Sequence, residues 1–199
     1  MSEFNKISVR EKEGSDIVME LTGKEANIVL DPTLMINADK WRKCSKYEAC
    51  IPDNPYCFVY SLGEKNDFFV DKLENIKQDL KIFDIGKTTK YGRNLPIGPS
   101  EFLYAIDNAE VVLTDSFHAT VFSILFHKDV WVFERPGINM SSRITSLAKM
   151  FECDKNFDKH GTLHMCVNSD YKIFDKILEK ERINSLKFLY DAFEMERRK

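Results

Sequence analysis

The sequence predicts a Rossmann-like α/β fold, in which a mostly parallel sheet is covered by helices on both faces. Short apolar runs typical of buried strands alternate about five times with segments of helical periodicity. This alternation is typical of parallel strands joined by crossover helices. The connections are too short to form separate domains, and 199 residues suffice for one substantial core. We therefore expect a single α/β domain over residues 1–199.

The first half of the chain contributes four of the expected strands. The segment between the third and fourth strands carries Phe69, Leu73, Ile76 and Leu80 at the spacing of one face of an amphipathic helix. Asp31-Pro32 ends the second strand, because the residue before a proline is driven out of helical geometry. The expected strands are 7–10, 26–30, 56–62 and 81–85, with helices over 11–21, 38–45 and 69–80.

The second half continues the alternation and ends in a long helix. Helices are expected from Pro99, over 117–126 and over 143–151, with strands at 111–113 and 130–133, and residues 155–169 are expected to be irregular. We expect a C-terminal helix over 170–199 that packs on the sheet or extends to a further domain. Its apolar stripe consists of Phe174, Ile177, Leu178, Leu186, Leu189 and Phe193.

Residues 111–126 contain the clearest prediction of a binding site. A short apolar strand runs directly into Thr114-Asp115-Ser116, whose oxygens can cap the following apolar helix. Ligands of open α/β sheets bind beyond the carboxyl ends of the strands, and a helix that begins there favours an anion. His118 lies in the first turn of that helix. The sequence therefore predicts a phosphate or carboxylate site near His118.

Further polar residues follow the ends of other expected strands and should meet at the same edge of the sheet. Two arginines beside a helix N-terminus are suited to phosphate and carboxylate groups. Each candidate also has a structural alternative: an ion pair of Arg10 with Glu11 or Glu13, a solvated Arg143, a capping role for Asp115, and a buried core position for His118. The candidates at this edge are Arg10, Gly63, Asp115, Ser116, His118, Asn139 and Arg143.

Composition and motifs exclude several classes of function. A net charge of -3 leaves no electrostatic footprint for nucleic acid. No apolar run has the roughly 18 residues of a transmembrane segment, and the first residues lack the apolar core of a signal peptide, so we expect a cytoplasmic protein. The GxGxxG, Walker and GxSxG motifs are absent from the sequence, and no cofactor is expected.

The five cysteines form no CxxC pair and are not expected to form a disulfide framework. Cys153, His160, His164 and Cys166 lie close together in the sequence and were considered as zinc ligands. Their spacing is unlike that of common zinc sites, so we expect no metal site.

Five blocks of sequence, in this order, resemble the polysaccharide pyruvyl transferase family over about residues 7–151. The second and fourth blocks are the most specific. The blocks are ISVREK at 7–12, VLDPTL at 29–34, GPSEFL at 98–103, TDSFHAT at 114–120 and SRI at 142–144.

The resemblance implies a glycosyltransferase-B-like fold of two Rossmann-like domains, of which this chain corresponds to the C-terminal one. The N-terminal partner domain is therefore expected to be missing, and the isolated chain to be inactive. The implied reaction transfers a pyruvyl group from phosphoenolpyruvate to a sugar of a cell-surface polysaccharide, or of a lipid-linked acceptor, as a ketal.

The resemblance also implies roles for individual residues. Arg10, Arg143 and the helix start at Ser116 would hold the donor's phosphate and carboxylate, and His118 would act as the general acid/base or would bind phosphate. Family members often carry Arg-x-His, whereas this chain has Ser116 in place of the arginine. Arg143 or Arg135 could supply that guanidinium.

Two other functions remain open from the sequence. A glycosyltransferase that uses a sugar nucleotide would place the diphosphate at Ser116 and the ribose hydroxyls at Glu101. A non-catalytic domain that binds an anion or a sugar is the second alternative.

Overall fold

The computed structural model describes residues 6–86, 95, 97–135 and 141–197, and its centre is a five-stranded sheet in the order β4-β3-β5-β6-β7. The strands are β3 (Tyr56–Tyr60), β4 (Lys81–Asp84), β5 (Val111–Thr114), β6 (Asp129–Val132) and β7 (Leu163–Met165). Four of them are parallel, and β7 runs antiparallel to β6 at one edge. The predicted fold class is confirmed.

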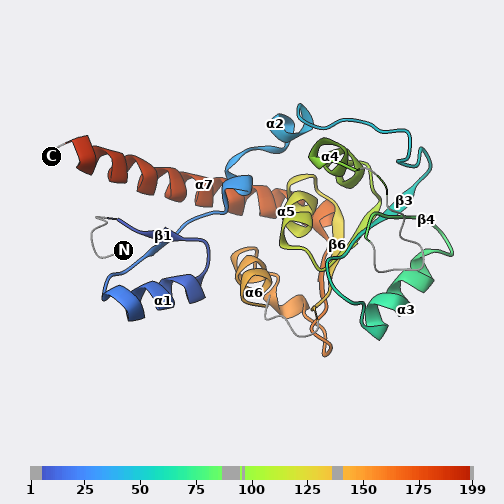
Figure 1. Cartoon of the computed structure of the whole chain (residues 1–199), viewed down its shortest axis with the longest axis horizontal. Helices are drawn as coiled ribbons and strands as arrows, with labels where there is room; N and C mark the ends of the chain where they lie inside the picture. The colour runs from blue at the N-terminus through green and yellow to red at the C-terminus, as the bar shows by residue number, and fades with distance from the viewer. Residues whose placement is uncertain (1–5, 87–94, 96, 136–140, 198–199) are drawn as a thin grey trace.

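Helices cover both faces of this sheet (Figure 1). Helix α3 (Asp67–Ile76) packs on one face, where Phe69 and Leu73 meet Cys57 and Val59 of β3. The other face carries the larger core, formed with α4 (Pro99–Asp107), α5 (Phe117–Leu125) and α6 (Ser141–Met150). Central strands buried on both faces require nearly continuous apolar sequence, which explains the YCFVY run of β3.

The edge strand β7 corrects the expectation that residues 155–169 are irregular. This segment contains the end of the short helix η2 (Asp154–Asn156) and then β7, after a turn in which Gly161 has a φ of 75°. A strand of three residues with a histidine at its centre carries too little periodicity to be recognised from sequence. The prediction failed for that reason.

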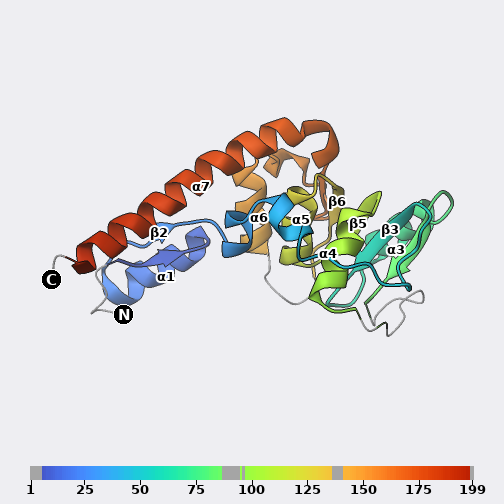
Figure 2. The same ribbon diagram turned by 90° about the horizontal axis from the view of Figure 1, so that it is seen from above.

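The first two strands form a small parallel sheet of their own. Strands β1 (Ser8–Val9) and β2 (Asn27–Ile28) pair with each other and flank α1 (Lys12–Thr22), and we refer to residues 7–28 as the N-terminal unit. Both views show this unit beside the far end of the C-terminal helix α7 (Val167–Arg197) (Figures 1 and 2). The description of residues 1–199 as one domain therefore remains a prediction.

Helix α7 connects the two parts of the molecule. Its beginning packs on the large sheet, where Phe174 and Leu178 are buried. Farther along, Ser185 Oγ accepts a hydrogen bond of 2.9 Å from the backbone N–H of Leu30, and Arg182 donates to the carbonyl of Leu34 at 2.7 Å. The second half of the predicted stripe, Leu186, Leu189 and Phe193, is exposed. Of the two alternatives left open for this helix, packing on the large sheet holds for Phe174 and Leu178 but not for the second half of the stripe.

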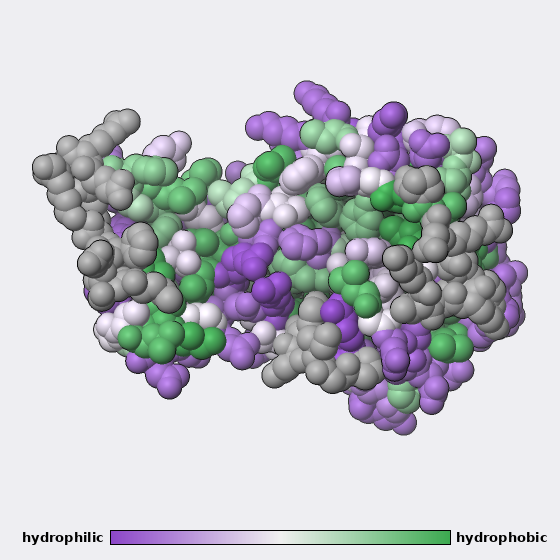
Figure 3. Space-filling model, in the orientation of Figure 1, coloured by the Kyte–Doolittle hydropathy of each residue, from purple (hydrophilic) through white to green (hydrophobic). Residues whose placement is uncertain are grey.

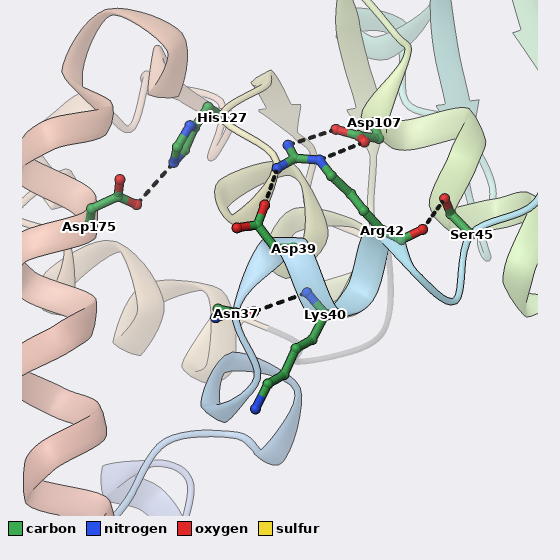
Figure 4. Close-up of polar contacts among 8 residues, drawn as sticks. All are labelled: Asn37, Asp39, Lys40, Arg42, Ser45, Asp107, His127 and Asp175. Carbon is green, nitrogen blue, oxygen red and sulfur yellow. Dashed lines mark hydrogen bonds and ion pairs between the residues drawn. The ribbon is translucent and has the colours of Figure 1, made fainter.

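The segment that follows the N-terminal unit is fixed to the large sheet by polar contacts (Figure 4). It contains the short helices η1 (Pro32–Met35) and α2 (Ala38–Arg42). Arg42 makes a bidentate pair with Asp107 of α4 at 2.9 and 3.0 Å. On the other side of α5, His127 Nε2 lies 2.9 Å from a carboxylate oxygen of Asp175 on α7. None of the described helices combines the length and the apolar composition needed to cross a bilayer.

Candidate functional site

A cleft of about 440 Å³ lies between the N-terminal unit and helices α5 and α6. Its lining includes Arg10, Glu11, Asp31, Phe117 and Arg143. In Figure 3, hydrophilic residues gather between the N-terminal unit, at the left, and the part of the molecule built on the large sheet, at the right. Two of the predicted site residues therefore line one cavity.

Arg10 and Asp31 meet because β1 and β2 are parallel and in register, with Val9 opposite Ile28. Each residue follows the end of its strand, and Arg10 Nη1 donates to Asp31 Oδ2 at 2.6 Å. The other oxygen of Asp31 accepts from the backbone N–H of Thr33 at 2.9 Å and so caps η1. The pairing of Arg10 with Glu11 or Glu13 that the sequence left open is not what forms.

The carboxyl of Asp31 is held in its charged form although its side chain is only 4% exposed. Burial acts to raise the pKa of Asp31, but the hydrogen bonds from Thr33 and Arg10 outweigh it and bring the pKa below its ordinary value. Asp31 is therefore an anion that lines the cleft, and it orients the guanidinium of Arg10.

His118 lies next to this ion pair. It occupies the first turn of α5, and its Nε2 is 3.9 Å from Asp31 Oδ2. Its side chain is 52% exposed, so the alternative of a buried core histidine does not hold. The imidazole is therefore accessible to a ligand, and the carboxylate of Asp31 is its acidic neighbour.

Arg143 approaches from α6. Its Nε donates to Glu11 at 3.3 Å, and the hydroxyl of the neighbouring Ser142 donates to the other Glu11 oxygen at the same distance. Among the described residues, the outer N–H groups of Arg143 have no partner, nor do the Nε–H and Nη2 groups of Arg10. The fold thus brings Arg10 and Arg143 to one cleft, and His118 lies next to Asp31, which lines the same cleft. Both arginines still have hydrogen-bond donors without a partner among the described residues.

The carboxylate of Asp115 forms hydrogen bonds within the protein. Its carboxylate accepts hydrogen bonds from Ser61 Oγ, the backbone N–H groups of Leu62 and Gly63, and Arg135 Nε, at 2.8 to 3.2 Å. Burial would raise its pKa, but these bonds lower it below the ordinary value. Asp115 therefore fixes the loop after β3 to the end of β5, and the capping role considered for it belongs to Ser116.

Three further residues lie next to Asp115, namely Ser116, Gly63 and Arg135. Ser116 is buried and caps α5, with its Oγ 3.4 Å from the backbone nitrogen of Ala119. A Cβ at Gly63 would lie 2.5 Å from Arg135 Cγ, so only glycine allows Arg135 to reach Asp115 unhindered. Arg135 and Asp115 line a second cavity of about 400 Å³, separate from the cleft at Arg10.

Two buried ionisable groups beyond β3 and β4, those of Asp84 and Lys65, were not identified from the sequence. Asp84 ends β4 and is 2% exposed; Oδ1 accepts from Gly86 N at 2.7 Å, whereas Oδ2 has no partner among the described residues. Burial raises the pKa of Asp84 to about 6. The Lys65 ammonium, also buried and without a hydrogen-bond partner in the described part of the chain, lies 4.6 Å from the centre of the Phe69 ring. The sequence signal that could have identified Asp84 is an aspartate at the end of an apolar strand.

Of the two remaining predicted residues, only Glu101 can be placed, and it does not line the cleft. Glu101 lies in the first turn of α4, with an oxygen 2.8 Å from the position that a Cβ at Gly98 would take, and it lines neither of the two cavities. Asn139 lies outside the described residues.

The sequence model of a protein family described as polysaccharide pyruvyl transferase matches residues 1–135, which is more than half of the chain. The matched range includes Arg10, Asp31 and His118 and ends before Arg143. Neither the curated proteins nor the solved structures provide a match.

Proposed function

Because the chain belongs to the polysaccharide pyruvyl transferase family, we propose that the cleft at Arg10, His118 and Arg143 binds phosphoenolpyruvate as the pyruvyl donor. The acceptor is a sugar of a cell-surface polysaccharide or of its lipid-linked precursor. Family membership supports a transferase of this general kind. The observation that carries the donor proposal is that Arg10 and Arg143 line one cleft, and that the accessible His118 lies 3.9 Å from the buried Asp31 carboxylate, which lines the same cleft.

Phosphoenolpyruvate suits this cleft because it carries a phosphate and a carboxylate on neighbouring atoms. A guanidinium pairs with either group through two parallel hydrogen bonds. Arg10 and Arg143 are each held by one carboxylate, Asp31 and Glu11 respectively, and this contact orients the fork without using all of its donors. An anion bound between them would take up the outer N–H groups.

In the proposed reaction His118 acts first as the general acid and then as the general base. The protonated imidazole delivers its proton to the methylene carbon of the donor, and C2 becomes a cationic centre. A sugar hydroxyl attacks C2 and loses its proton, for which the neutral imidazole is the acceptor. A second hydroxyl of the same sugar then attacks C2, the C2–O bond to phosphate breaks, and the proton of this hydroxyl leaves with the phosphate, which completes the cyclic ketal. An imidazole changes its charge near neutral pH, as this sequence of steps requires.

Ser116, which replaces the arginine common in the family, would not contribute to donor binding in this scheme. Its side chain is buried as the cap of α5. We propose that Arg10 and Arg143 provide the positive charge that the missing guanidinium would have supplied. Asp115 and Gly63 then support the site indirectly, by fixing the loop beside the start of α5.

We also propose that a second Rossmann-like half covers the N-terminal unit and completes the transferase. Parallel sheets are normally buried on both faces. In this chain the two-stranded sheet and α1 leave Ile28, Ile17 and Leu21 exposed, as α7 leaves Leu189 and Phe193. On this proposal residues 1–199 bind the donor, and turnover requires the other half.

Donor binding can be tested on the chain itself by calorimetric titration with phosphoenolpyruvate. Loss of one charge-assisted contact costs about 1.5 to 3 kcal/mol, so Arg10→Ala and Arg143→Ala should each weaken binding by about 10- to 100-fold. Arg42→Ala is the matched control, because Arg42 is equally exposed but pairs with Asp107 away from the cleft (Figure 4). If the control weakens binding as much, the cleft is not the donor site.

The role of His118 is tested by turnover in the two-domain protein. His118→Ala should abolish phosphate release while donor affinity changes only a few-fold, whereas His127→Ala, which removes a histidine paired with Asp175, should retain turnover. Near-normal rates in His118→Ala would exclude the acid/base assignment. Binding of a nucleotide diphosphate sugar in place of phosphoenolpyruvate would instead identify a glycosyltransferase.

A further inference from the structure

The antiparallel edge of the large sheet brings Asp129 close to two potential metal ligands, His164 and Cys166, that lie far from it in the sequence. In the ladder between β6 and β7, Val130 is opposite Met165 and Trp131 is opposite His164. The same register places Asp129 opposite Cys166. Because side chains alternate between the faces of a strand, Asp129, His164 and Cys166 all lie on the face that carries Trp131. Their ligand atoms lie within 4.8 Å of one another.

One separation agrees with that of a tetrahedral zinc site. With Zn–S of about 2.3 Å, Zn–N of about 2.0 to 2.1 Å and a tetrahedral angle, sulfur and nitrogen should be about 3.5 Å apart. Cys166 Sγ lies 3.4 Å from Nε2 of His164, but it also lies 3.6 Å from Nδ1. The two residues are therefore close enough to share an ion, and the imidazole must turn so that one nitrogen points at it.

The surroundings keep the imidazole beside Trp131. His164 stacks on Trp131 with the ring centres 3.9 Å apart and an angle of 10° between the planes. Its backbone carbonyl accepts a hydrogen bond of 3.3 Å from the side chain of Asn156. The three residues are half-buried, so an ion can reach them and still be partly shielded from water.

The chemistry of the three side chains suits a divalent ion. Such an ion binds a neutral imidazole and attracts both the thiolate of Cys166 and the carboxylate of Asp129.

We propose that Asp129, His164 and Cys166 bind one Zn²⁺ ion, with a fourth position open to water. A sulfur, nitrogen and carboxylate set favours zinc over Mg²⁺ or Ca²⁺, which prefer oxygen ligands. The ion would tie β7 and the start of α7 to β6. This site differs from the cysteine and histidine group considered from the sequence, because Cys153 donates to the Phe151 carbonyl and His160 stacks on Phe68.

Cobalt substitution tests the proposal without requiring enzymatic activity. The folded chain, freed of metal with a chelator, is titrated with Co²⁺ and then with Zn²⁺. We expect one equivalent of Co²⁺ to produce a thiolate charge-transfer band and the visible bands of tetrahedral cobalt, and Zn²⁺ to abolish both. Absence of binding at one equivalent, or bands without thiolate character, would overturn the proposal.

Substitutions assign the ligands. Cys166→Ser should abolish the charge-transfer band, and His164→Ala should weaken Zn²⁺ binding at least tenfold. Cys44→Ser, at an exposed cysteine outside the cluster, is the matched control and should retain both. If Cys166→Ser does not fold, Asp129→Asn decides: a retained band with at least tenfold weaker affinity supports the site, and unchanged affinity overturns it.

Discussion

Replacement of Asp84 by asparagine is expected to stabilise the protein at neutral pH and to have little effect near pH 4. Asp84 is 2% exposed, and burial raises the pKa of its carboxyl from 3.8 to about 6. Asparagine has nearly the same shape, and its carbonyl can still accept the hydrogen bond from Gly86. The substitution therefore removes the charge while keeping the contact.

The sign of the effect follows from the difference in pKa. Between pH 3.8 and about 6 the folded protein binds a proton at Asp84 that the unfolded chain has already released, so stability falls as the pH rises through this range. Each pH unit corresponds to about 1.4 kcal/mol, which gives a full effect of about 3 kcal/mol at pH 7 and about half of that at pH 5. The Asp84→Asn protein has no carboxyl at this position and therefore does not lose this stability as the pH rises.

Urea unfolding of the two proteins at pH 5, 6, 7 and 8 measures the difference directly. We expect the free energy of unfolding of Asp84→Asn to exceed that of the wild type by an amount that grows from pH 5 to pH 7 and is constant above. The exposed Asp79→Asn should show no such trend. A difference independent of pH, or a less stable Asp84→Asn protein at pH 7, would refute the reasoning.

Three further substitutions address the contacts that hold the fold, each measured by urea unfolding. Asp31→Ala should cost about 2 kcal/mol at pH 7, because it removes a cap and the ion pair with Arg10. Since the pKa of Asp31 is lowered in the fold, that cost should shrink as the pH falls below 3.8, and a constant cost would contradict the ion pair. Phe58→Ala, at the fully buried centre of the sheet, should cost about 3 to 5 kcal/mol, and a loss below about 1 kcal/mol would contradict its core position. Arg42→Ala should cost less than about 1 kcal/mol, because the pair with Asp107 is partly exposed, and high salt should reduce the difference.

Much of the fold follows from local sequence. The apolar runs of β3 and β5 could be recognised because both faces of these strands are buried, so periodicity and burial agree. The start of α5 was equally clear, since Ser116 caps the helix from within the same turn. His118 lies, as predicted, in the first turn of α5.

The contacts that each polar side chain makes depend on partners that are distant in the sequence. Asp115 was predicted to contact a ligand, but Ser61, 54 residues away, and Arg135 occupy its carboxylate. Arg10 had acidic neighbours in the chain, yet the parallel pairing of β1 with β2 presents Asp31 instead. Local sequence gives no information on such pairings.

The sequence by itself determined the α/β class, the order of most elements and the position of His118 at a helix start, because these depend on periodicity and on capping within a few residues. Only the tertiary structure decided that Arg10 and Arg143 line one cleft with Asp31, that His118 lies next to Asp31, and that Asp129 lies opposite Cys166. These contacts depend on strand register and on the packing of whole elements. Both are set by burial of the core, in which residues far apart in the chain become neighbours.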